Sequence, residues 1–594
     1  MRKTKWIFFV YLAIVGLIVI GVGVSLSFTP PRDPHTLYVE ELATLKSLDP
    51  AEANDEPSDD MIGEIYESLY NYKYGVQPYT MFPELAAEMP RYSADGMEMT
   101  IPLRRGIHFY DPGKKVWPGG IGPEIKARDV IYSFKRVCDF NIASPVYSAV
   151  FQDQIVGLDD WWNYTKSIGA AKVDWDRPVK GFQILDDYTI RLVMPRPNPQ
   201  MVYNLAAMWT AVVSRDAVNY WGRDFRLHPV GSGSYCMTEY LRDQRIILEA
   251  NPIYRGRGDV DGGAIVADAD RMPHIERVEY DFFDELVPPY LLFTQGLFDV
   301  AGIPKESFNQ AIRVDTGDLS PALAKKGVIL RKSDEAVTDY VGFNMQDPIL
   351  GRNKPLRQAM SMAFDRNAYI TNFLNGRGMP AIGPIPPGFP TFDRNAVNPY
   401  TQLNLEAARE KMRQAEAING GPIPTLRILM QDSDTTSRQM AEDFVLRMKQ
   451  IGLTIEPEYR DFARYLEMVD NRQTQLFEAG WLADYPDEQD FLQLFYGKNA
   501  PAMGLNSAAY MNPEFDALYE KAAVMRDSPE RRGLYLRMEH FVMEDCPWLL
   551  VEYPKLFALH YDWVSGGYHM AYGYGLLQHL KLDEQFRRKR LEEN

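Results

Sequence analysis

The spacing of hydrophobic positions predicts a mixed α/β fold, and the clearest signal lies in residues 424–459. Every second residue of the segment 426–430 is apolar, as on one face of a β-strand. Apolar residues at helical spacing follow, namely Met440, Phe444, Met448 and Ile451. Gly452 stands where a glycine commonly ends a helix, and the strand pattern resumes at 453–455. This order predicts a βαβ unit with two parallel strands and a right-handed crossover.

Three further segments alternate as β-strands do. Residues 97–110 alternate on both sides of a predicted turn at Arg105-Gly106. Residues 188–194 follow two turn-forming aspartates, and residues 276–283 show the same period of two. These segments add further strands to the predicted α/β chain.

A second amphipathic helix is predicted after residue 353. Its apolar face is formed by Leu356, Ala359, Met360, Ala363 and Phe364. Asn353 and Pro355 are residue types that favour a helix start, and residues 381–390 form a loop rich in proline and glycine. The 594 residues exceed a single hydrophobic core, and no tandem repeat is present, so several α/β units are expected.

The amino terminus has the pattern of a membrane anchor. Residues 1–5 are basic, and the segment from Trp6 to Phe28 runs 23 residues without a charge. About 20 apolar residues span a bilayer as a helix. The basic start favours an amino terminus inside the cell and residues 35–594 outside, at the periplasmic or extracytoplasmic face of the inner membrane.

A cleaved signal peptide is the alternative for the same segment. The apolar part of such a peptide usually spans about 7–15 residues, so this run is long for that role, and the small-x-small site at residues 25–27 is weak. No cysteine follows the apolar run, so a lipid anchor has no acceptor. We therefore favour the uncleaved anchor, followed by a proline-containing spacer at residues 29–36.

Composition and charge limit the classes of function that this chain can have. The net charge of −17 argues against a nucleic-acid-binding surface. The three cysteines, Cys138, Cys236 and Cys546, form neither a disulfide framework nor a zinc motif, although one disulfide is possible in an exported chain. Nucleophile-elbow, metalloprotease and phosphate-loop motifs are missing, and we identify no cofactor. Asp484 and Asp487 flank Pro486 and are interpreted as turn residues rather than as an acid–base pair.

Several segments, in the correct order, resemble the oligopeptide- and dipeptide-binding proteins of ABC importers, the family 5 extracellular solute-binding proteins. The segments are 47–50 (SLDP) with 64–72, 82–113 with 126–137, 229–256 (beginning PVGSGSY), 341–370 (beginning VGFN) and 479–492 (AGWLADYPDEQDFL). Together they span most of residues 37–555. One such block would be weak evidence, whereas five in order identify the family.

The resemblance implies a fold of two lobes joined by hinge strands, of the type II periplasmic-binding-protein class, with an extra subdomain. The implied organisation is an anchor and spacer at 1–34, lobe I at 35–75 and 191–290, the extra subdomain at 76–190, lobe II at 291–550, and a return to lobe I with the tail at 551–594. A tryptophan-rich insertion at 157–181 is interpreted as a docking surface, a lid, or an excursion that packs on its own aromatic residues.

The resemblance also implies a ligand site between the lobes. The ligand lies extended and pairs with strand segments, which is β-augmentation. An aspartate in a W-x-x-D-Y-like motif receives the ligand's α-ammonium, and Asp484 matches it, with Trp481 as a wall of the cleft and Tyr485 completing the motif. The backbone-pairing segments are Ala479, Gly480 and Trp481 on one lobe and Glu41, Leu42, Ala43 and Thr44 on the other.

The implied protein is a monomeric receptor rather than an enzyme. It would capture an oligopeptide-like ligand and deliver it to ABC permease subunits. Three alternatives remain: a receptor for another small solute such as an oligosaccharide, a hydrolase or peptidase that uses the cleft acids, and a sensor or chaperone that does not transport.

Overall fold

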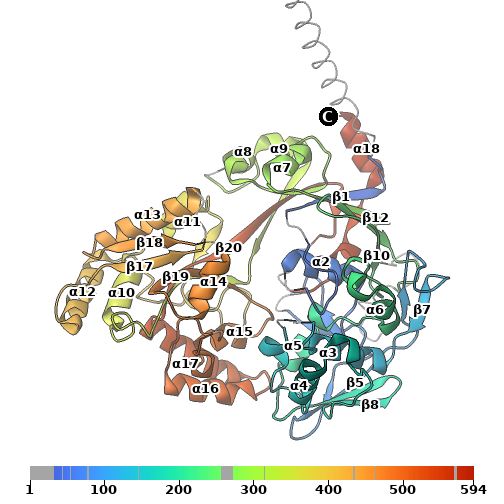
Figure 1. Cartoon of the computed structure of the whole chain (residues 1–594). Helices are drawn as coiled ribbons and strands as arrows, with labels where there is room; N and C mark the ends of the chain where they lie inside the picture. The colour runs from blue at the N-terminus through green and yellow to red at the C-terminus, as the bar shows by residue number, and fades with distance from the viewer. Residues whose placement is uncertain are drawn as a thin grey trace, which may run out of the picture.

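The structure is a computed structural model, and it describes most of the chain after residue 31 (Figure 1). The described residues are 32–42, 45–53, 55–76, 79–142, 144, 146–255, 272–313, 315–431, 435–460, 462–502, 504–567 and 572–593. The expected membrane anchor, from Trp6 to Phe28, lies outside these ranges. Within them, no helix is long and apolar enough to cross a membrane.

Lobe I is built on a four-stranded sheet. Its order is β1 (Thr36–Glu41), β12 (Arg277–Phe282), β11 (Arg245–Ala250) and β10 (Tyr235–Leu241). The first pair is parallel and the other two pairs are antiparallel. The expected strand at 276–283 is therefore confirmed, as the partner of β1. Lobe I also contains the helices α2 (Glu56–Ile65), α6 (Arg215–Trp221) and α18 (Glu584–Glu593). Two small strand pairs complete it, namely β2 (Tyr70–Tyr72) with β3 (Met81–Pro83) and β21 (Val564–Ser565) with β22 (Lys581–Leu582).

Lobe II contains the larger sheet. The order along its main path is β13 (Val300–Gly302), β20 (Trp548–Tyr561), β15 (Val337–Phe343), β19 (Leu476–Leu482), β17 (Leu426–Met430) and β18 (Ile455–Tyr459). Strands β14 (Val328–Asp334) and β16 (Gly378–Pro380) also pair with β20. Its helices are α10 (Lys354–Ala363), α11 (Arg366–Phe373), α12 (Leu405–Asn419), α13 (Thr435–Lys449), α14 (Phe462–Asp470), α15 (Gln489–Leu492), α16 (Pro513–Ala523) and α17 (Pro529–Asp545).

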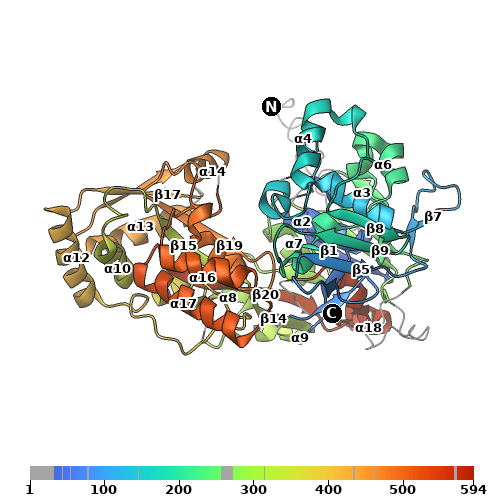
Figure 2. The same cartoon turned by 90° about the horizontal axis from the view of Figure 1, so that it is seen from below.

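Strand β20 links the two parts of the molecule. Its first half pairs with β15 inside lobe II, and its second half forms an antiparallel ribbon with β14. In two perpendicular views this ribbon, with α7 (Val287–Thr294), α8 (Phe308–Ala311) and α9 (Pro321–Lys325) around it, lies between the lobes (Figures 1 and 2). The long strand is thus the structural candidate for the hinge.

The βαβ unit predicted at 424–459 is confirmed. Strands β17 and β18 pair in parallel and α13 crosses between them, with Gly452 in the left-handed region at φ 82°. The helix predicted after residue 353 is α10. The Asn353 side chain accepts a hydrogen bond from the Leu356 N–H at 3.2 Å, which satisfies a free donor of the first turn.

The extra subdomain holds the sheet β4 (Arg91–Tyr92), β5 (Glu98–Pro102), β9 (Thr189–Val193) and β8 (Phe182–Asp186) and the helices α3 (Ala127–Val137), α4 (Leu158–Ile168) and α5 (Met201–Asn204). The strands expected at 97–110 and 188–194 exist, but the hairpin expected around Gly106 is wrong. Strand β5 pairs with β9, whereas β6 (His108–Tyr110) pairs with β7 (Ile121–Glu124). Pairing to distant strands overrides the local turn.

The tryptophans of the 157–181 insertion pack inside this subdomain. Trp161 is buried, and its indole N–H donates to the Lys135 carbonyl at 3.1 Å. Trp162 stacks on Tyr147 with centroids 4.0 Å apart, and Trp175 contacts Trp161. This packing favours the third interpretation of the insertion. The three cysteines are buried and free, so no disulfide forms among them.

Candidate functional site

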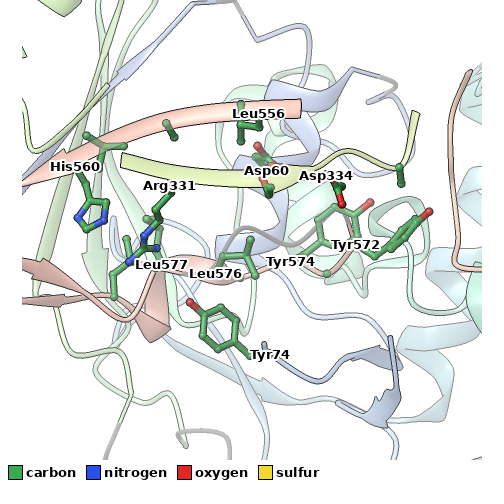
Figure 3. A pocket seen from close by; sticks show the side chains of 18 of the residues that line it. Asp60, Tyr74, Arg331, Asp334, Leu556, His560, Tyr572, Tyr574, Leu576 and Leu577 are labelled. Carbon is green, nitrogen blue, oxygen red and sulfur yellow. The ribbon is translucent and has the colours of Figure 1, made fainter. Parts of the chain in front are cut away.

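A cavity of about 780 Å³ lies between the lobes, beneath the β14–β20 ribbon (Figure 3). Its walls come from α2 and β12 of lobe I, the ribbon itself, the lobe II loop 387–389, and the carboxyl-terminal segments of lobe I. Sites for small ligands commonly have this size and lie at domain interfaces. The described part of the chain contains no cluster of His, Cys, Asp or Glu suited to a metal ion.

The cavity has both acidic and basic groups. Figure 3 shows Arg331 and His560 at one end, with Asp60, Asp334 and Tyr572 further along. Apolar side chains from β20 and from residues 576–580 fill the wall between these groups. The site can therefore hold an elongated ligand that carries groups of both charges.

The segment after β19 turns around a buried aspartate that the sequence analysis did not single out. The Oδ2 atom of Asp490 accepts hydrogen bonds from the indole N–H of Trp481 and from the backbone N–H of Asp484, both at 3.0 Å. Asp490 is fully buried. The Asp490 side chain thus fixes the position of the W-x-x-D motif through Trp481 and the backbone of Asp484.

Asp484 belongs to lobe II and is exposed to solvent, and it is not among the residues that line the cavity. Its charge contributes to the raised pKa of Tyr572, a lobe I residue that lines the cavity, so the Asp484 charge acts on the cavity wall. The surrounding protein removes water and raises the pKa of Asp484 to about 6. Burial also raises the pKa of Asp490, and the Asp484 charge adds to this rise.

Strand β19 has a backbone edge that its neighbours leave partly unpaired. Strand β15 pairs with its whole length, from Leu476 to Leu482, but β17 pairs only with Leu476 and Phe477. The Ala483 N–H bonds toward β15, so in an antiparallel ladder the backbone of Gly480 and Leu482 points to the other side. An extended ligand can pair with this edge as an added strand. The edge lies in the segment 479–481, which the sequence analysis predicts to pair with the ligand.

Tyr485 has a different position from the one expected of a ligand contact. Its ring stacks on Tyr203 of α5, with centroids 5.6 Å apart and planes 7° from parallel. Arg526 of lobe II lies over the ring of Tyr92 in the same region, 4.7 Å from its centroid. These contacts join the lobes on the side opposite the hinge ribbon (Figure 1). Tyr485 is thus engaged in a contact between the lobes.

The expected pairing segment of lobe I is only partly described. Ala43 and Thr44 lie outside the described residues. Glu41 ends β1, where its carbonyl accepts from the Phe283 N–H at 2.9 Å, and its charge contributes to the raised pKa of Tyr280 in the cavity wall. Leu42 is 43% exposed. These contacts place Glu41 close to the lobe I wall of the gap.

Asp487 has a structural role, as its turn position suggested. It is buried and accepts bonds from both Arg531 nitrogens, at 2.5 and 3.1 Å, and from the Tyr535 hydroxyl at 3.0 Å. A carboxylate with all these partners is not free for acid–base chemistry. The candidate site therefore combines an accessible acid at 484, an open strand edge and a cavity with polar ends.

Comparisons with known proteins identify the class. The model of the bacterial extracellular solute-binding proteins, family 5 (middle), matches residues 80–502, and the chain belongs to this family. As a member it is an extracytoplasmic binding receptor rather than an enzyme.

Individual relatives are distant in sequence but cover nearly the whole chain. Heme-binding protein A of Haemophilus influenzae is 24% identical over 528 residues, 88% of this chain and 87% of its own. Oligopeptide-binding protein OppA of Bacillus subtilis is 23% identical and covers 84% of each chain. The periplasmic binding protein DppA of Helicobacter pylori, solved with the peptide STSA, has a TM-score of 0.70 at 23% identity and covers 92% of this chain and 98% of its own. The last likeness shows the two-lobed fold.

Proposed function

We propose that this protein captures a short peptide between its lobes and delivers it to the permease of an ABC importer. The observation that carries the proposal is the position of Asp484. Asp484 is exposed, its backbone N–H donates to the buried Asp490 carboxylate, and it directly follows strand β19, whose edge is partly unpaired. A peptide provides both an ammonium group for the acid and a backbone for the strand edge.

The names of the relatives support a peptide as the ligand. Among them are oligopeptide-, di/tripeptide- and dipeptide-binding proteins, and one solved structure with this fold contains a peptide. Hinge motion of β14 and β20 would bring further lobe I residues onto the ligand, beyond the existing contact of Tyr203 with Tyr485. Closure needs contacts that only the closed state makes, and a ligand that touches both lobes provides them.

We also propose that the uncharged segment from Trp6 to Phe28 anchors the protein in the inner membrane. The described body begins at Arg32, inside the predicted spacer, and its guanidinium lies over the ring of Tyr38 at 4.1 Å, which fixes the chain to lobe I. The receptor would then stay near its permease rather than diffuse freely. Fractionation of cells that produce the full chain tests this proposal, since an anchored protein remains with the membranes after a high-salt wash.

Mass spectrometry of small molecules released from the purified protein tests the ligand class. The expected result is a set of peptides with free amino termini. Recovery of a sugar or a tetrapyrrole in stoichiometric amount, without peptides, would contradict the proposal.

Ligand affinity should fall in mild acid. An ammonium group binds the ionised form of Asp484, whose pKa of about 6 in the free protein lies above that of an ordinary aspartate. Because the proton must leave before the ligand binds, affinity is full above this pKa and falls by about tenfold for each pH unit below it. Dissociation constants measured by calorimetry from pH 8 to 4.5 check the slope. The slope should disappear in Asp484→Asn; the same slope in that variant would assign it to another group.

A further inference from the structure

We infer that Arg331 receives a carboxylate group of the ligand, at the hinge end of the cavity. The inference rests on the proposed peptide-binding function and deepens it, because it assigns the negatively charged group of the ligand to a place in the site. It concerns a residue of strand β14, outside the motif that contains Asp484 and on the hinge ribbon rather than in the body of either lobe.

The position of Arg331 follows from the register of the ribbon. Ile329 pairs with His560, and Arg331 pairs with Ala558, so Arg331 and His560 are diagonal neighbours on one face of the two strands. That face forms the roof of the cavity, and both side chains line it. Figure 3 shows the two side chains close together at one end, away from Asp60 and Asp334.

The guanidinium of Arg331 has no acidic partner. Within the described chain it makes no ion pair and no hydrogen bond, although the side chain is half-buried and burial lowers its pKa. The other deeply placed arginines differ. Arg136 binds Asp49, and Arg255 binds Glu67, each through two nitrogens. A buried charge is usually paired, so an unpaired one in a ligand cavity points to a partner that the ligand supplies.

Two neighbouring features shape this end of the cavity. A Cβ atom on Gly567 would lie 2.5 Å from Nη1 of Arg331, so the glycine leaves the room that the guanidinium occupies. The Nδ1 atom of His560 lies 2.9 Å from the Tyr561 carbonyl, while its buried Nε2 atom has no hydrogen-bond partner. The polar groups that this end of the cavity presents are thus basic ones, with the Arg331 guanidinium next to the His560 ring.

A planar guanidinium with free N–H groups binds a carboxylate through two parallel hydrogen bonds. Asp484 offers a negative group on lobe II, and Arg331 offers a positive group on the hinge ribbon. The gap therefore suits a zwitterionic ligand whose two charged ends bind different parts of the protein. Because β14 belongs to the hinge ribbon, a carboxylate bound there would also contact the element that moves on closure.

The test compares three probes on the purified full-length protein. They are a pool of Ala-X-Ala tripeptides as free acids, the same pool as carboxyl-terminal amides, and Ala-Glu-Ala amide, whose only carboxylate is a side chain. Competition binding is measured for wild type, Arg331→Gln and Lys325→Gln. The last variant removes the same charge from the exposed end of α9, outside the cavity.

We expect Arg331→Gln to weaken binding of the free acids about 10- to 100-fold, the loss of one charge-assisted contact, and to leave the amides unchanged. Lys325→Gln should bind all probes like wild type. Wild type could bind Ala-Glu-Ala amide as tightly as the free acids, and Arg331→Gln could lose this binding. That result would show that Arg331 binds an acidic side chain of the ligand rather than its carboxyl terminus.

Equal loss of acids and amides in Arg331→Gln, or no loss for either, would overturn the inference while peptide binding itself stands. The proposed function fails separately, and this inference with it, if wild type binds none of the three probes. Circular dichroism checks that Arg331→Gln is folded. An affinity for the amide pool equal to that of wild type gives a second check.

Discussion

Replacement of Asp484 by asparagine is expected to weaken binding of a free-amine peptide by about 30-fold or more. The carboxylate is the acid that the W-x-x-D motif presents to the gap, and the Asp490 network holds its backbone. Asparagine keeps the size of the side chain but leaves the ligand's ammonium without a counter-charge in a site that the closing lobes withdraw from water. Isothermal titration at pH 7.5, with the peptides recovered from the purified protein, measures the change.

The matched control is Asp393→Asn. Asp393 is an exposed lobe II aspartate that accepts from the Asn395 N–H at 2.9 Å, and an asparagine can still accept this bond. It should leave the affinity within a factor of two of wild type. If Asp484→Asn behaved like this control, the ammonium would bind elsewhere, and the acids Asp60 and Asp334 of the cavity would be the next residues to test.

Replacement of Asp487 by asparagine is expected to destabilise lobe II by about 3–5 kcal/mol. The change leaves the Arg531 guanidinium charged and buried, with 3% of its side chain exposed, but without its two-nitrogen partner. The Tyr535 hydroxyl then competes with Arg531 for the single amide oxygen that remains. Urea unfolding followed by tryptophan fluorescence gives the midpoint and the free energy.

Asp527→Asn serves as the comparison for this variant. Asp527 pairs with Arg532 at 2.6 Å on the surface, where the side chains are 60% and 43% exposed. Such a pair contributes at most about 1 kcal/mol. Similar losses of unfolding free energy in the two variants would mean that the buried Asp487–Arg531 pair contributes no more to stability than the exposed Asp527–Arg532 pair.

Local patterns predicted the elements whose neighbours in space are also neighbours in sequence. The βαβ unit at 424–459 is one case, because its parallel strands β17 and β18 are adjacent in the sheet. The hairpin around Gly106 is the opposite case. The turn exists, at φ 76°, but β5 and β6 pair with strands that the alternation of residues 97–110 does not specify. The same limit hid the role of β20, which pairs with strands from 172 to 260 residues earlier in the chain.

The sequence predicted the part of the candidate site that lies in the W-x-x-D-Y motif. The W-x-x-D-Y resemblance predicted ligand-binding roles for Trp481 and Asp484, and it could not show that Asp490 accepts a hydrogen bond from each of them. That interaction depends on complete burial of an acid, which no residue pattern revealed. The sequence analysis also missed Arg331, because an arginine in an alternating strand does not by itself indicate a ligand contact. Only the structure shows that its guanidinium has no partner in the described chain. The nearby Gly566-Gly567 pair was the only hint, since paired glycines often mark a close approach.

The central claim is that the gap between the lobes receives a positively charged amino terminus at Asp484. Titration of the wild-type protein with one peptide and with its amino-terminally acetylated form, at pH 7.5, tests it most directly. The predicted result is tight binding of the free amine and a loss of at least 30-fold on acetylation, in keeping with removal of the ion pair. Equal affinity for both peptides would contradict the claim.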